Sequence, residues 1–121
     1  MSTQVVNAAQ KLTMVDQHWS PKIIAELNGQ QVKVAKLLGE FDWHFHEHED
    51  ELFWVMAGSL EMHLRDQVIH LNVGDMFVVP RGVEHKPVAQ SECHVVLFEP
   101  ASTLNTGNLS NERTVADLDR I

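Results

Sequence analysis

The residues from His44 to Glu51 have the types and the spacing that binding of a cation requires. Three of the eight histidines, His44, His46 and His48, fall in this stretch together with four acids. On a strand, residues two apart share a face and lie roughly 6.5 Å from each other. The imidazoles of His44 and His46 can therefore bind the same cation. Four residues separate His46 from Glu51, which stands at the start of an apolar run. If Glu51 lies on a neighbouring strand, its carboxylate can bind the same ion.

A second stretch, residues 74–85, carries one more histidine. It reads as a short apolar strand, then a turn with Pro80 and Gly82, then His85. Three neutral imidazoles and one carboxylate form a common site for a first-row transition metal. The sequence therefore predicts one divalent ion (iron, zinc, nickel or manganese) bound by His44, His46, Glu51 and His85. The alternatives are polar residues scattered along a sheet edge, or a vestigial site that no longer binds metal.

The first stretch resembles the first of the two cupin motifs. In words, that motif is Gly, five residues, His-x-His, three or four residues, Glu, six residues and Gly. Here His44, His46, Glu51 and Gly58 stand at the matching positions. Gly39 stands one residue too close to His44, a departure that involves no ligand.

The second stretch resembles the second cupin motif, which is Gly, five residues, Pro-x-Gly, two residues, His, three residues and Asn. Gly74, Pro80, Gly82 and His85 match it. The closing Asn is replaced by Ala89, at a position that is not a ligand in the family. The two matches together are highly specific, whereas either one alone is weak evidence.

The resemblance implies a single cupin domain over residues 1–121. It places a double-stranded β-helix, or jelly-roll barrel, at about residues 30–100, between an N-terminal extension (1–29) and a polar tail (101–121). The tail is similar to that of small bacterial single-domain cupins. Such proteins often carry a mannose-6-phosphate-isomerase-like label by analogy, and that label is weak evidence of activity.

The elements that must position the site read as short strands separated by turns. Asn28-Gly29 is a strong tight-turn signal, and Asn7 is a good N-cap for a short helix that ends at Leu12. Residues 114–121 read as a frayed final helical turn. Even spacing of short strands predicts an all-β barrel or sandwich. The predicted strands are residues 22–27, 31–38, 52–57, 60–65, 68–71, 76–79, 86–88 and 94–98.

Period-two alternation indicates which side chains line the site. Counting from the predicted ligand Glu51, Phe53 and Val55 point inward and Trp54 points outward. His48 shares the face of the first two histidines if their strand continues, and otherwise lies at the rim. His94 precedes an apolar strand and is a further candidate for the pocket lining.

A metal ion with four protein ligands keeps open positions for a substrate oxygen or for dioxygen. We therefore expect a metal-dependent enzyme that acts on a small organic substrate, in the oxygenase or the isomerase and lyase class. The alternative is a non-catalytic module that binds or senses a small molecule through the metal. Isomerisation needs a second acid or base. The nearby acids Glu47, Glu49, Asp50 and Glu84 have no pattern that places them inside.

Composition narrows the partners of the chain. Nine basic and 17 acidic residues give a formal charge of −8 without a basic cluster, which argues against nucleic acid and anionic membranes. The chain has no membrane-length apolar run and no signal-peptide pattern, and the single Cys93 excludes an internal disulfide, so the cytoplasm is the predicted compartment. As in many cupins, we expect a homodimer, formed through residues 22–38 and the outward Trp43 and Phe45.

Overall fold

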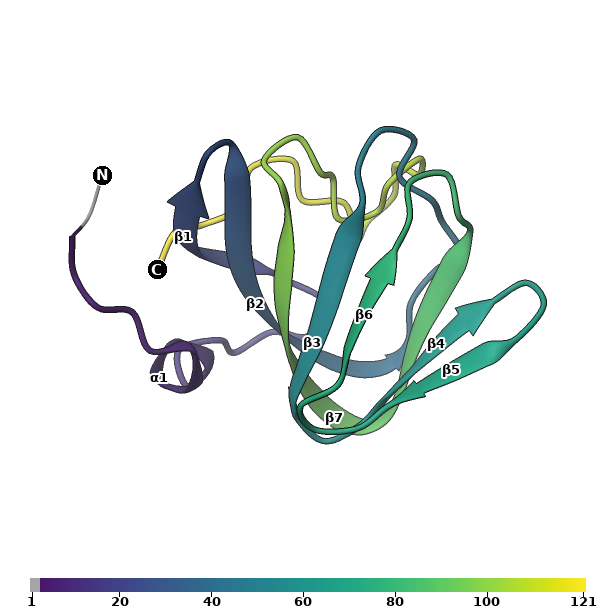
Figure 1. Ribbon diagram of the computed structural model, residues 1–121, viewed down its shortest axis with the longest axis horizontal. Coiled ribbons are helices and arrows are strands. Elements are labelled where there is room, and N and C mark those ends of the chain that lie inside the picture. Colours follow the sequence, from purple (N-terminus) through teal and green to yellow (C-terminus); the bar gives the residue numbers. More distant parts are fainter. Residues whose placement is uncertain (1–2) are drawn as a thin grey trace.

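The computed structural model describes residues 3–121 and confirms an all-β jelly roll with one short N-terminal helix (Figure 1). The strands pair in antiparallel fashion and surround one interior, and α1 packs outside them. The predicted strands 22–27, 68–71 and 76–79 have the bounds that the structure shows. The elements are α1 (Ala8–Leu12), β1 (Lys22–Leu27), β2 (Gln30–Glu40), β3 (Glu51–Ala57), β4 (Leu60–Leu64), β5 (Val68–Leu71), β6 (Met76–Val79) and β7 (His85–Pro100).

Strand β7 joins the two parts of the barrel. Its first residues pair with β4, from Leu64 opposite His85 to Glu61 opposite Val88. Its second half lies between β2 and β3. The strand order is β1-β2-β7-β3-β6, with β5 attached through β4. A ligand at the start of β7 is thereby held close to residues that enter from β3.

Two predictions about the backbone are wrong. Residues 86–88 and 94–98 belong to one strand of 16 residues rather than to two. The polar residues 90–92 interrupt the apolar pattern because their side chains are exposed, while the backbone stays extended. No helix forms over residues 114–121, because the chain end pairs with β1. There the Ile121 N–H donates to the Ile23 carbonyl at 3.0 Å.

The alternation along β3 is confirmed. Phe53 and Val55 are buried at 5% and 0% exposure, whereas Trp54 is 38% exposed on the other face. The inward residues pack with apolar side chains from the other strands to form the main core. Since Glu51 has the same parity as Phe53, its carboxylate also points into the barrel.

A second, smaller core lies on the outer face of β2 and β7. Leu12 and the nearby Val15 pack there against Val34 and Val96, and Asn7 caps α1 by accepting from the Gln10 N–H at 2.9 Å. Val34 is completely buried. The helix therefore covers part of the face assigned to a dimer contact, and the dimer itself stays a prediction.

Within residues 3–121, no helix is long and apolar enough to cross a membrane.

Candidate metal centre

The segment that carries His44 and His46 lies outside the named strands, although the prediction that the two histidines share a face rests on strand geometry. It is held by an isolated bridge, in which His44 and His85 exchange backbone hydrogen bonds of 3.0 and 2.9 Å. Two residues further on, the His46 carbonyl accepts from the Gly82 N–H at 2.7 Å. The Pro-Gly turn before β7 thus fixes the segment against the strand that supplies the third histidine.

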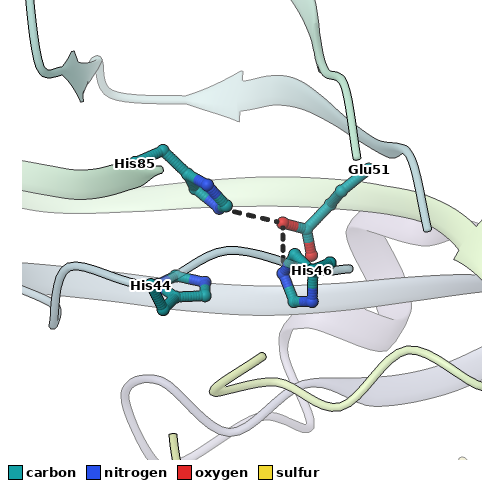
Figure 2. A group of neighbouring side chains, drawn as sticks. All are labelled: His44, His46, Glu51 and His85. Carbon is teal, nitrogen blue, oxygen red and sulfur yellow. Dashed lines mark ion pairs between the residues drawn. The ribbon is translucent and has the colours of Figure 1, made fainter. Parts of the chain in front are cut away.

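The four predicted ligands lie together inside the barrel (Figure 2). One ligand atom from each of His44, His46, Glu51 and His85 lies within 4.8 Å of the others. Oε1 of Glu51 is 3.3 Å from Nε2 of His46 and 3.5 Å from Nε2 of His85. Exposure is 4% or less for all four residues. Such a set of imidazole and carboxylate donors can enclose one small cation.

Backbone carbonyls orient two of the rings. Nδ1 of His44 lies 2.8 Å from the Asp42 oxygen, and Nδ1 of His85 lies 2.9 Å from the Val83 oxygen. A carbonyl only accepts, so each Nδ1 carries the proton and donates it. The lone pair then resides on Nε2, the atom that faces the cluster. Outer hydrogen bonds of this kind are typical partners of metal-binding histidines.

Several buried polar atoms of the cluster have no hydrogen-bond partner among the described residues. They are both ring nitrogens of His46, Nε2 of His85 and Oε1 of Glu51. A buried polar atom left unpaired costs about 1–3 kcal/mol, and such atoms are few in native proteins. A cation bound between Nε2 of His46, Nε2 of His85 and Oε1 of Glu51 would pair three of these four atoms, so the residues present fit a metal ion.

Burial acting on His44 and neighbouring polar groups acting on Glu51 keep these two residues in the protonation states that a metal requires. Desolvation, with further repulsion from His85, lowers the pKa of His44 to about 4, so its ring is neutral near pH 7. Burial works to raise the pKa of Glu51, but the adjacent Glu99, His46 and His85 hold it well below its ordinary value. A neutral imidazole and an ionised carboxylate are the ligand forms.

A cavity opens beside the cluster. Its volume is about 40 Å³, and the atom-free space is about 480 Å³ when the open mouth is included. His44, Glu51 and the predicted lining residue Phe53 form part of its wall. Trp19 also lines it and stacks on Phe41 with ring centroids 4.8 Å apart. A small molecule in this cavity lies next to the cluster.

Two ionisable residues that the sequence analysis did not select also line this cavity. Nζ of Lys33 is 2.9 Å from Oε1 of Glu99, and the side chains are only 2% and 3% exposed. Burial, together with the charge of Glu51, raises the pKa of Glu99 well above its ordinary range. The sequence did contain a signal for Lys33, because this residue has the same parity as Ala35 and Leu37 and therefore shares their inward face.

The remaining candidates lie elsewhere. Val55 is buried in the core. The His48 side chain is 78% exposed and 3.8 Å from Glu47, because the loop before β3 carries it outward. His94 does not face the cavity as expected. It follows the inward Cys93 on β7, so its side chain points outward and pairs with Glu92 at 2.7 Å.

The polar tail braces the ligand segment from outside. The Phe45 N–H donates to Oδ1 of Asn108 at 2.9 Å, and the Asn108 N–H donates to the Phe45 carbonyl at 3.0 Å. The preceding Gly107 lies against the Phe45 carbonyl and the His44 ring. Thr106 is fully buried. The tail is therefore ordered by packing on the segment between the first two ligands.

Known proteins share this fold and much of this sequence. Residues 29–99 match the Cupin domain family. A cupin-2 domain containing protein from Shewanella frigidimarina is 50% identical with a TM-score of 0.78, over 79% of this chain and 94% of that one. A protein from Neisseria meningitidis is 31% identical with a TM-score of 0.75, over 81% of this chain and all of that one.

A curated relative, the uncharacterised protein YdbB of Bacillus subtilis, is 38% identical over 64 residues. That match covers 52% of this chain and little more than half of YdbB, 57% of its length. The family match, by contrast, spans more than half of this chain and includes all four clustered ligand positions. The chain belongs to the cupin family.

Proposed function

We propose that this protein binds one divalent transition metal ion and uses it to transform a small organic molecule held in the adjoining cavity. The ligands are His44, His46, Glu51 and His85. The proposal depends chiefly on one observation. Four buried ligand atoms converge within 4.8 Å, and those of His46, Glu51 and His85 have no hydrogen-bond partner in the described chain.

When bound, such an ion supplies Lewis-acid activation of a substrate oxygen. The residues of the chain supply the other requirements. The Asp42 and Val83 carbonyls hold two rings in the ligating tautomer. The largely apolar walls of the cavity surround the body of the substrate. The pair of Lys33 and Glu99 adds ionisable groups inside the cavity, which favours the isomerase and lyase class over the oxygenase class.

Elemental analysis of protein purified without added metal tests the metal assignment. We expect about one divalent ion per chain, and strong loss of that ion in His46→Ala and in His85→Ala, because the remaining ligands no longer enclose it. His48→Ala is the matched control, since this histidine is in the same loop but 78% exposed. Unchanged stoichiometry in both ligand variants would contradict the assignment.

Isotope exchange separates the reaction classes. Metal-loaded protein is incubated in deuterated water with a panel of small hydroxy, keto and unsaturated acids. An isomerase or lyase introduces solvent deuterium at a substrate carbon, which NMR detects. An oxygenase instead consumes dissolved oxygen. A module that only binds its ligand does neither, and that result in the presence of bound metal would contradict the catalytic part of the proposal.

A further inference from the structure

The cavity beside the cluster combines an apolar wall with one charged end. Nine of its fourteen lining residues are apolar, so the body of a ligand must be largely apolar. The charged end is formed by Lys33, Glu99 and Glu51. The cavity volume is about 40 Å³. A single ring or a short branched chain suits such a space better than a sugar or a nucleotide.

The ammonium group of Lys33 has donors to spare. It carries three N–H groups, and within residues 3–121 Glu99 is the hydrogen-bond partner that the structure gives it. Its side chain is 2% exposed, so bulk water does not satisfy the others. The buried Glu99 carboxyl lies between Lys33 and Glu51 and interacts with both. The charged end therefore offers the remaining N–H donors of Lys33 to an incoming polar group.

The charges at this end do not balance once a divalent ion is bound. The ion and Lys33 contribute three positive charges. Glu51 contributes one negative charge, and Glu99 contributes one or none. The three histidines are neutral as ligands. The loaded site is therefore positive whether or not Glu99 carries a proton. An uncompensated charge is costly in a buried site, so a negative group on the ligand is favoured.

We infer that the cavity takes a small organic anion, a carboxylate or an enolate on an apolar body, with its negative oxygens toward Lys33 and the cluster. This inference rests on the proposed function, because the positive charge includes the metal ion. It names the substrate class for the same site. The Lys33 ammonium acts as the specificity-determining group, and the stacked Trp19 and Phe41 form part of the apolar wall.

Calorimetry on zinc-loaded protein with three ligands of one shape tests the inference. Benzoate is an anion, benzamide is neutral and benzamidinium is a cation. We expect benzoate to bind at least tenfold more tightly than benzamide, and benzamidinium not to bind. Isobutyrate provides a smaller anion for the same narrow space. Equal affinities for benzoate and benzamide would overturn the inference, and so would failure of both anions to bind.

Substitution of Lys33 by Met tests the residue itself. We expect benzoate affinity to fall tenfold or more while zinc stoichiometry stays at one. Lys36→Met is the matched control, because this lysine is on the other face of β2, and its affinities should not change. The double variant Lys33→Met with Glu99→Gln avoids a lone buried carboxylate and should show the same loss.

Zinc stoichiometry is measured in every sample, so two failures can be told apart. Wild-type protein that binds no zinc would overturn the proposed function and this inference together. Zinc-loaded protein that binds no anion would overturn the inference alone. An anion preference that survives in the Lys33→Met protein would come from the metal and would overturn the role of Lys33.

Discussion

Replacing Gly107 with alanine should damage the metal centre from outside the barrel. A Cβ atom at this position would lie far inside van der Waals contact with the Phe45 carbonyl oxygen and 3.0 Å from Cδ2 of the His44 ring. The first obstacle is backbone, which cannot rotate away. The second is a proposed metal ligand. Relief of the overlap therefore requires the tail to move, or the ligand segment, or both.

The cost can be estimated by comparison with a second glycine. Gly107 has a φ of +59° and Gly29 a φ of +78°, and a Cβ on Gly29 meets nothing within 4 Å. Alanine at either site costs about 1 kcal/mol for the left-handed backbone. The overlap at Gly107 adds about 1–3 kcal/mol, the usual cost of overpacking. Gly29→Ala thus provides the conformational cost without the overlap.

Thermal unfolding in the presence of a chelator measures this difference. At about 4 °C per kcal/mol for a domain of this size, Gly107→Ala should melt about 4–12 °C below Gly29→Ala. Zinc affinity provides the second measurement. We expect a loss of about 10–100-fold in Gly107→Ala, the usual effect of disturbing the outer support of a ligand, and no change in Gly29→Ala.

Equal melting temperatures and equal zinc affinities in the two variants would refute the reasoning, since the tail would then not brace His44. A lower melting temperature with unchanged zinc affinity would show a purely structural contact.

Further expectations concern pH, thiol reactivity and assembly. The metal-free protein should lose about 2 kcal/mol between pH 7 and pH 5, because unfolded His44 binds a proton near its ordinary pKa of 6.5 and the buried ring only near a pKa of about 4. Urea unfolding of wild type and of the control His48→Ala should show the same loss, and a flat profile would contradict it. Cys93 is fully buried, and burial raises its pKa to about 11. A disulfide reagent at pH 8 should therefore label it only after denaturation, and rapid labelling of native protein would count against this burial. We also propose a homodimer, which light scattering would exclude by a particle mass near 13.7 kDa. Met76 is 56% exposed on β6, and dissociation by Met76→Glu but not by Val32→Glu would place the contact there rather than on the early hairpin.

The local pattern of the chain was sufficient to predict the four candidate ligands and most strands. His44, His46 and Glu51 are near neighbours in sequence, and His85 directly follows a turn marked by proline and glycine. Turn residues and period-two alternation are properties of short segments, so they can be read without knowing what lies across the barrel. The inward direction of Phe53 followed from the same parity.

Tertiary structure decided the features that depend on contacts between distant segments. Lys33 and Glu99 are 66 residues apart, and Phe45 and Asn108 are 63 apart. Alternation assigns a residue to a face, but it does not say which charged groups meet across a closed interior. For the same reason the exposed residues 90–92 concealed the continuity of β7. Only closure of the barrel brings a buried ion pair to the cavity and a polar tail against the ligand segment, because both result from packing between elements rather than from the preference of any single one.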